Sequence, residues 1–142
     1  MARNCRFAVS VHICALLAMD EENTATSDWI AKSVNTNPVV VRRILAALGR
    51  AGIVKSQRGS AGGSALAKPS DAVTLLDISR AVDEVEKPPV HEEPNRKCPV
   101  GAHIQPILTD IITQAETARE KELAQLTLAE VVGRLLQRGA EA

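Results

Sequence analysis

Aromatic residues are almost absent from this chain of 142 residues: it contains one phenylalanine (Phe7), one tryptophan (Trp29) and no tyrosine. A core can still form, because 45% of the residues are hydrophobic and most of these are Ala, Val, Ile and Leu. The length fits one small domain with an appended element. Such a small chain buries a modest fraction of its surface, so dimerisation would add stability.

Long apolar runs are missing as well. Apolar runs such as Ile13–Met19 and Pro38–Val41 are far too short to span a bilayer. The chain does not open on a charged segment followed by an apolar one, as a secretory signal would. We therefore expect a cytoplasmic protein that does not associate with membranes.

Cysteine and histidine are scarce. Three cysteines, Cys5, Cys14 and Cys98, form an odd and sparse set that does not build a disulfide framework. Cys14 falls on the apolar stripe of a predicted helix, which favours a small buried core residue. The chain has three histidines and no suggestive carboxylate pair, so no convergent acid, base and nucleophile can be assembled. We therefore do not expect an enzyme.

The charge is balanced in total but uneven along the chain. Seventeen basic residues offset seventeen acidic ones. Residues 31–70 nevertheless carry seven basic residues and no acidic one, whereas residues 71–142 carry eight basic and thirteen acidic residues. A long acid-free window predicts a surface that binds a polyanion such as DNA.

Two helices are predicted before residue 35. The first spans about residues 5–19, because apolar residues recur at three- and four-residue spacing. Its predicted stripe consists of Phe7, Val11, Cys14, Ala15 and Ala18. A second, short helix follows Thr26 or Ser27, either of which can cap it.

The strongest motif is a helix-turn-helix over Ser27–Leu48. Ala31 supplies the small residue at the helix contact, and Asn35 accepts the left-handed conformation that the turn needs. A third helix begins at Pro38 and ends near Gly52. Apolar anchors occupy the required positions on both helices: Ile30, Val34, Val41, Ile44, Leu45 and Leu48.

The opposite face of the third helix suits the major groove of DNA. At 100° per residue, Val39, Arg43, Ala46 and Arg50 lie away from the apolar anchors, with Arg42 to one side. Small residues and arginines let a helix approach base edges. The alternative is a solvent-exposed helix with incidental arginines.

A glycine-rich hairpin follows. Residues 53–58 and 64–67 predict two short strands around the tip 59–63, with Arg58 at its base. Such a wing can donate main-chain N–H groups to phosphates. A phosphate-binding P-loop is excluded, because no Lys-Ser/Thr follows the glycines and no helix begins there.

The C-terminal half predicts three more helices. Thr74 and Asp77 resemble a capping pair for a helix over residues 75–84. After a proline-containing loop, a long helix starts between Gly101 and Gln105, since Pro106 is expected in a first turn. A final helix, residues 128–137, packs back on the domain.

These parts together resemble one known family. The segments are CRFAVSVHICALLA, IAKSVNTNPVVVRRILAALGRAGIVKSQRGSAGGSALA, VTLLDISRAV and CPVGAHIQPILTDIITQAE. In this order they resemble the Rrf-type family of bacterial regulators, which includes an iron–sulfur cluster regulator, a nitric-oxide-sensitive repressor and a cysteine-metabolism repressor. The resemblance covers nearly the whole chain. It implies a winged helix-turn-helix, a dimer joined through the long helix, and palindromic operator DNA.

The resemblance also implies site residues. It assigns Thr36, Asn37, Val39, Arg42 and Arg43 to the groove, and Ser56, Arg58, Gly59 and Ser60 to the wing. Arg50 joins them from its place on the outer face of the third helix. The dimer interface is expected along the long helix, at Ile104, Ile107, Leu108, Ile111, Ile112 and Ala115.

The chain departs from its cluster-bearing relatives at one place. Those relatives carry three closely spaced cysteines before the dimer helix, where this chain has only Cys98. We therefore expect neither an iron–sulfur cluster nor any other cofactor. A cluster with unusual ligands, such as His91 or Glu92, is the alternative. A zinc site of Cys98, His91 and His103 would lack a fourth ligand.

Cys98 itself is a candidate redox sensor. It follows two basic residues and precedes a helix start, both of which favour thiolate. The structural alternative is that Cys98 only packs the start of the dimer helix. A small-molecule effector bound in the same loop is the alternative signal.

The sequence thus predicts a mainly α protein with a small β-hairpin wing and a long C-terminal dimerisation helix. We assign residues 1–84 to the DNA-binding domain, 85–101 to a loop or sensor segment, and 102–142 to the dimerisation and C-terminal helices. The predicted function is a homodimeric, DNA-binding transcriptional repressor that binds no metal and responds to an oxidant or ligand. The alternative is a winged helix used only for protein–protein contact.

Overall fold

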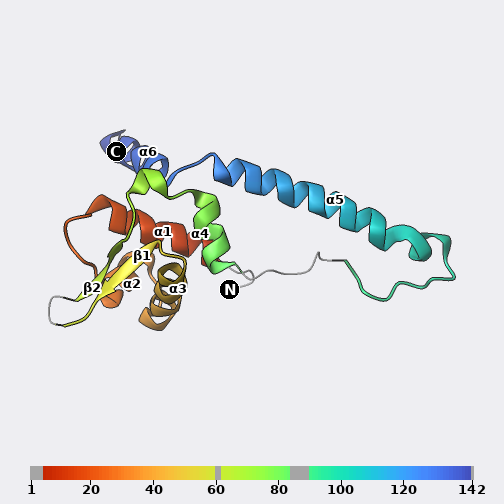
Figure 1. Ribbon diagram of the computed structural model, residues 1–142, viewed down its shortest axis with the longest axis horizontal. Helices are drawn as coiled ribbons and strands as arrows, with labels where there is room; N and C mark the ends of the chain where they lie inside the picture. The colour runs from red at the N-terminus through yellow and green to blue at the C-terminus, as the bar shows by residue number, and fades with distance from the viewer. Residues whose placement is uncertain (1–4, 60–61, 84–89, 142) are drawn as a thin grey trace. The chain divides into compact units, whose positions relative to one another are not determined.

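The computed structural model describes residues 5–59, 62–83 and 90–141. The predicted fold class is confirmed: the chain is mainly helical with one two-stranded antiparallel hairpin (Figure 1). Its elements are α1 (Arg6–Met19), α2 (Ser27–Val34), α3 (Pro38–Arg50), β1 (Val54–Gln57), β2 (Gly63–Leu66), the short 3-10 helix η1 (Ser70–Ala72), α4 (Leu75–Val82), α5 (Pro99–Ala124) and α6 (Leu128–Glu141).

The chain divides into two compact units. Residues 1–83 and 124–142 form the first, and residues 84–123 form the second. The helix α6 belongs to the first unit, where it contacts α1 and η1, as the sequence predicted. Backbone hydrogen bonds tie this return segment down: Leu75 N–H donates to the Leu126 carbonyl at 2.9 Å, and Leu128 N–H to the Val73 carbonyl at 2.8 Å.

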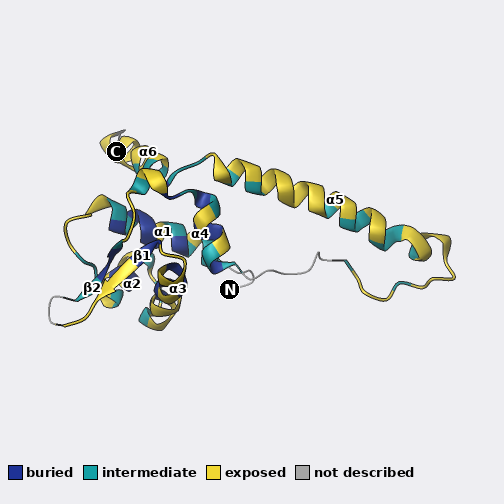
Figure 2. Cartoon of the chain, viewed as in Figure 1, coloured by how far each residue is buried: buried dark blue, intermediate teal, exposed yellow. Residues whose placement is uncertain are grey.

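The core of the first unit surrounds α1, which contacts α2, α4, α6 and β2. The stripe predicted for α1 is only partly right. Cys14 and Ala15 are buried, but Phe7, Val11 and Ala18 are half-buried, and the missed Ile13 and Leu17 lie at the centre of the core. Helices pack against α1 from several sides, so its buried face is wider than one stripe (Figure 2).

The predicted cap of α4 is confirmed. The Asp77 N–H donates to the Thr74 hydroxyl at 3.0 Å, and the Thr74 N–H donates to the Asp77 carboxylate at 2.9 Å. Each residue therefore satisfies a backbone donor of the other at the helix start. The helix ends at Val82. Residues 84–89, which include the last residue of the predicted helix and the start of the predicted loop, lie outside the described ranges.

The start predicted for the long helix is wrong. The helix α5 begins at Pro99 and places Pro106 inside it, two turns later. Pro99 takes the first position, where a missing N–H costs nothing. The early turns are also anchored: the Gln105 side-chain amide donates to the His91 and Glu92 carbonyls at 2.6 and 2.8 Å. These contacts offset the interior proline.

No residue of α5 is buried within one chain (Figure 2). Ile107 and Ile111 are 54% and 55% exposed, and the other predicted interface residues are half-buried or exposed: Ile104, Leu108, Ile112 and Ala115. Among the described residues, neither α5 nor any other helix combines the length and apolar character that a membrane crossing requires.

Candidate nucleic-acid interface

The helix-turn-helix has the local chemistry that its sequence predicted. Thr26 is the cap of α2, because its hydroxyl accepts the Trp29 N–H at 3.1 Å. The helix ends at Asn35, which adopts φ 61° and ψ 52° and is the one non-glycine residue with positive φ in the described ranges. The Thr36 N–H then donates to the Ala31 carbonyl at 3.0 Å and closes the turn.

A second cap sets the direction of α3. The Asn37 side chain accepts the Val39 N–H at 2.8 Å, and Pro38 occupies the first helical position. Of the two predicted groove residues before the helix, Thr36 is half-buried and Asn37 is exposed. The turn and the start of α3 are thus fixed by hydrogen bonds from backbone N–H groups as well as by packing.

The two faces of α3 divide as predicted. The inner face is buried by Val41, Ile44, Leu45, Ala47 and Leu48. The outer face exposes Val39, Arg42, Arg43, Ala46 and Arg50. An exposed Val39, 46% accessible, has no partner in this unit to cover its methyl groups, and such a group can contact a thymine methyl.

The arginines of α3 differ in their surroundings. Arg42 lies 3.8 Å from the Asp28 carboxylate on α2, at the long end of the range for an ion pair, and both side chains are largely exposed. Sequence reasoning missed this pairing. Arg43 makes no ion pair within the described part of the chain, so its five donors are available to an external anion.

The hairpin forms the predicted wing. Its strands β1 and β2 pair antiparallel, with Ser56 opposite Ser64. Ser56, Arg58 and Gly59 are exposed, as a DNA contact requires. Gly59 has φ +106°, which a side chain would strain. Ser60, also predicted as a wing contact, lies outside the described residues.

A contact that the sequence did not reveal holds the wing to the start of α2. The Ala25 N–H donates to the Ser64 carbonyl at 2.9 Å, and the Ser64 N–H returns to the Ala25 carbonyl at 2.8 Å. A Cβ on Gly63 would lie 2.7 Å from the Ala25 carbonyl oxygen. The glycine therefore permits the close approach that joins the wing to the helix-turn-helix.

In the second unit, Cys98 immediately precedes α5 and is exposed. Its own N–H donates to the Asn95 carbonyl at 3.1 Å, which fixes the turn. Hydrogen bonds from the Gly101 and Val100 backbone N–H groups lower the pKa of the Cys98 thiol. Of the two causes that the sequence suggested, the helix start is confirmed, because these N–H groups belong to the first turn of α5; the flanking basic residues Arg96 and Lys97 do not contribute.

Some members of the resembling family carry an iron–sulfur cluster, and the described residues do not fit one. Burial raises the pKa of Cys14 to about 12, so this thiol is neutral in the core of the first unit, as expected for a structural cysteine. No group of three or more His, Cys, Asp or Glu side chains in the described ranges could hold a metal ion. Cys98 therefore belongs to no such group within the described part of the chain.

Proteins similar to this chain are named as candidate regulators or DNA-binding proteins. YwnA of Bacillus subtilis (strain 168), named as a candidate HTH-type transcriptional regulator, is 45% identical over 133 residues, 93% of this chain and 98% of YwnA. A crystal structure described as a candidate DNA-binding protein is 40% identical, covers 89% of this chain and 97% of that chain, and superposes with a TM-score of 0.72.

The fold extends to more distant structures. CymR (YrzC), the global cysteine regulator of B. subtilis, is 24% identical with a TM-score of 0.64, covering 94% of this chain and 98% of its own. The Rrf2 family, described as an iron-dependent transcriptional regulator, matches residues 3–134. The match spans nearly the whole sequence and agrees with the winged helix-turn-helix seen here. This chain therefore belongs to the Rrf2 family, which comprises transcriptional regulators rather than enzymes.

Proposed function

We propose that this protein is a repressor that binds a palindromic operator as a homodimer, with α3 in the major groove and the hairpin along the backbone. The observation that carries the proposal is the outer face of α3, where exposed Arg43 and Arg50 stand in an acid-free stretch of sequence. We infer repression, rather than activation, from the resemblance to repressors of the same family. A protein acting on chromosomal DNA would work in the bacterial cytoplasm.

Dimerisation supports the same proposal. The residues Ile107 and Ile111 leave an apolar stripe exposed on α5, and a second copy of α5 would cover it. Two-fold symmetry would then present two recognition helices to two half-sites. By this proposal Thr36, Asn37, Val39 and Arg42 contribute to the groove face, and Ser56, Gly59 and Ser60 to the wing.

Gel shifts on genomic fragments test the proposal against a pure protein–protein role. The expected result is retention of a subset of fragments, with affinity that falls steeply as salt rises, because phosphate contacts release counterions. A winged helix used only for protein contact would retain no fragment at any salt concentration. Transcription from a retained promoter should fall when purified protein is added, and a rise would overturn repression.

Arg58→Ala tests the wing. Because Arg58 is exposed at the base of the hairpin tip, its proposed partner is a phosphate, which carries no sequence information. The substitution should weaken binding to all duplexes evenly and reduce the slope of log affinity against log salt by about one. Loss of affinity for the operator alone would instead place Arg58 on a base. Binding titrations at four salt concentrations measure both quantities.

We also propose that Cys98 senses oxidants. The thiolate would attack a peroxide oxygen and release hydroxide, leaving sulfenic acid; a second thiol then displaces water and forms a disulfide. The exposed sulfur and the backbone donors of Val100 and Gly101 support this reactivity. Oxidation at the start of α5 would change the distance between the two recognition helices of the dimer. That distance must match about 34 Å, which is one helical turn of B-DNA.

Cys98→Ser tests the switch. Peroxide, hypochlorite or a disulfide stress agent should reduce operator binding by the parent and leave Cys98→Ser unaffected. Because the pKa of Cys98 is lowered, its alkylation rate should fall off at a lower pH than that of an ordinary cysteine thiol as the pH is decreased. Equal loss of binding in both proteins would remove Cys98 as the switch. An unaffected parent would favour ligand sensing.

Purified protein should be colourless. Cys98 belongs to no group of three or more candidate ligands among the described residues, and Cys14 lies in the core of the first unit, so visible absorption from an iron–sulfur centre is not expected. Spectra of protein prepared without oxygen, with iron and sulfide assays, provide the measurement. Stoichiometric iron and sulfide that depend on Cys98 after anaerobic reconstitution would contradict this proposal.

A further inference from the structure

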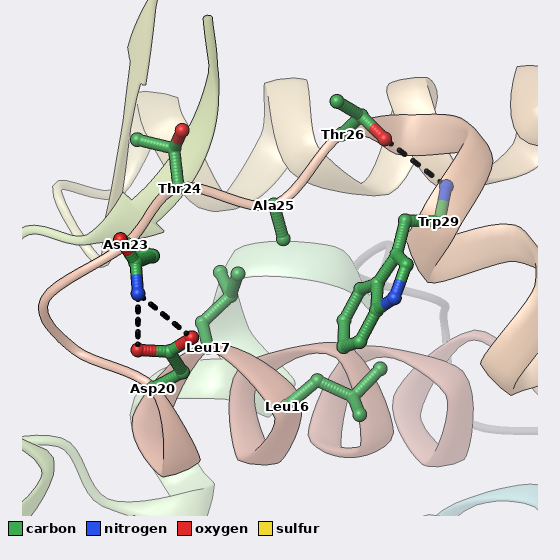
Figure 3. A pocket seen from close by; sticks show the side chains of 8 residues that line it. All are labelled: Leu16, Leu17, Asp20, Asn23, Thr24, Ala25, Thr26 and Trp29. Atoms are coloured by element: carbon green, nitrogen blue, oxygen red, sulfur yellow. Dashed lines mark hydrogen bonds between the residues drawn. The ribbon is translucent and has the colours of Figure 1, made fainter. Parts of the chain in front are cut away.

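A pocket of about 440 Å³ opens in the first unit between the end of α1, the following loop and the start of α2 (Figure 3). Its volume falls in the range of sites for small organic molecules. It is lined by Leu16, Leu17, Asp20, Asn23, Thr24, Ala25, Thr26 and Trp29. None of these residues lies on the outer face of α3 or at the wing tip, so the proposed DNA contacts do not account for the pocket.

One part of the pocket wall is apolar and includes the single tryptophan of the sequence. Leu17 is 2% exposed and reaches the pocket from the core, while Trp29 remains 53% exposed. The indole lies over Leu16, and Ala25 points into the same space (Figure 3). An aromatic face beside aliphatic carbon suits the apolar part of a ligand, and it also attracts a cation.

One edge of the pocket is acidic. The Asn23 side-chain amide donates to both oxygens of the Asp20 carboxylate, at 3.1 and 3.2 Å, which orients that carboxylate at the pocket wall (Figure 3). Asp20 forms no ion pair with a described residue, and none of the lining residues is basic. Exposed Glu21 and Glu22 follow directly and add to the negative potential.

We propose that this pocket binds a small amphipathic amine, with its ammonium group at Asp20 and its apolar group against Trp29 and Leu17. A carboxylate held by an amide and an open indole face together recognise an organic cation and disfavour an anion of the same shape. A neutral molecule would leave the Asp20 charge unmatched.

The pocket wall is also part of the DNA-binding architecture. The Thr26 hydroxyl caps α2 through the Trp29 N–H, and the neighbouring Ala25 pairs with Ser64 of the wing. A ligand against this wall would bias the positions of α2 and β2 together. Amine binding and operator binding, the latter resting on the proposed function, therefore change one another's affinity by the same factor.

Fluorescence tests the site without DNA. Trp29 is the single tryptophan and no tyrosine is present, so the emission reports this pocket alone. Phenethylamine should change the emission saturably, whereas phenylacetate and 2-phenylethanol at the same concentrations should not. Asp20→Asn should weaken phenethylamine binding by about fivefold, as expected for a partly exposed ion pair. Glu22→Gln, which removes a neighbouring charge outside the lining, is the matched control and should weaken binding much less than Asp20→Asn, because solvent screens this exposed charge.

Several results would overturn the site. They are an equal response to phenylacetate, no saturation up to about 10 mM phenethylamine, or equal affinity in Asp20→Asn and the parent. Operator titrations with saturating phenethylamine then test the coupling separately. Unchanged operator affinity would overturn the regulatory role while the site stands, whereas failure of the amine-free parent to bind DNA would count against the proposed function alone.

Discussion

Replacing Arg43 by alanine should weaken binding to the operator by about 1–3 kcal/mol, the usual worth of one good base contact. The side chain is exposed on the outer face of α3 and makes no ion pair among the described residues, so its guanidinium enters the groove without first breaking a contact in the protein. Its neighbour Arg42 lies near Asp28 and should contribute less. Binding titrations with operator and scrambled duplexes separate the specific part of the loss.

The control for Arg43→Ala is Arg138→Ala. This substitution removes the same charge from an exposed position on α6, in the same compact unit but away from the helix-turn-helix. It should leave operator affinity nearly unchanged. Equal losses in the two variants would mean that Arg43 acts through net charge, and parent-like binding by Arg43→Ala would mean that the outer face of α3 does not read DNA.

Replacing Ile111 by glutamate should convert the dimer into monomers and weaken operator binding by about 100-fold or more, because a monomer loses the gain from binding two linked half-sites. Ile111 is 55% exposed in one chain, at the centre of the apolar stripe of α5. In a dimer the new carboxylate would be buried against apolar side chains without a cation. Analytical ultracentrifugation at micromolar concentration measures the assembly, and titration with operator DNA measures the affinity.

Thr113→Glu is the matched control, since it places the same charge on an exposed position of α5 that faces away from Ile111. This variant should remain dimeric and bind DNA as the parent does. A dimeric Ile111→Glu would show that the interface lies elsewhere, and a monomeric parent would remove the dimer from the account.

The parts of the site that the sequence predicted well are those decided by local chemistry. Asn35 tolerates the left-handed turn, Pro38 begins a helix after Asn37, and Thr74 with Asp77 forms a cap; each depends on residues a few positions apart. The same local rules gave the two faces of α3 and the hairpin. Such signals survive folding because the backbone groups that they satisfy lie within one or two turns.

What the sequence did not reveal depends on distant contacts. The two backbone hydrogen bonds between Ala25 and Ser64 join segments nearly forty residues apart. The pocket beside Trp29 forms only when α1 and α2 pack together. The interior position of Pro106 likewise depends on the anchoring of Gln105 to the preceding loop. Helix propensities describe the cost of a proline within its own helix. They do not include stabilisation by contacts with distant segments.

The most direct test of sequence-specific binding is selection of duplexes from random DNA by the purified parent protein. We expect enrichment of a two-fold symmetric site whose half-site centres lie about one helical turn, or a whole number of turns, apart. That site should bind about a thousandfold or more tightly than random duplex, with affinity that falls linearly on a log–log plot against salt. Failure to enrich any sequence, or equal affinity for selected and random duplexes, would contradict sequence-specific binding.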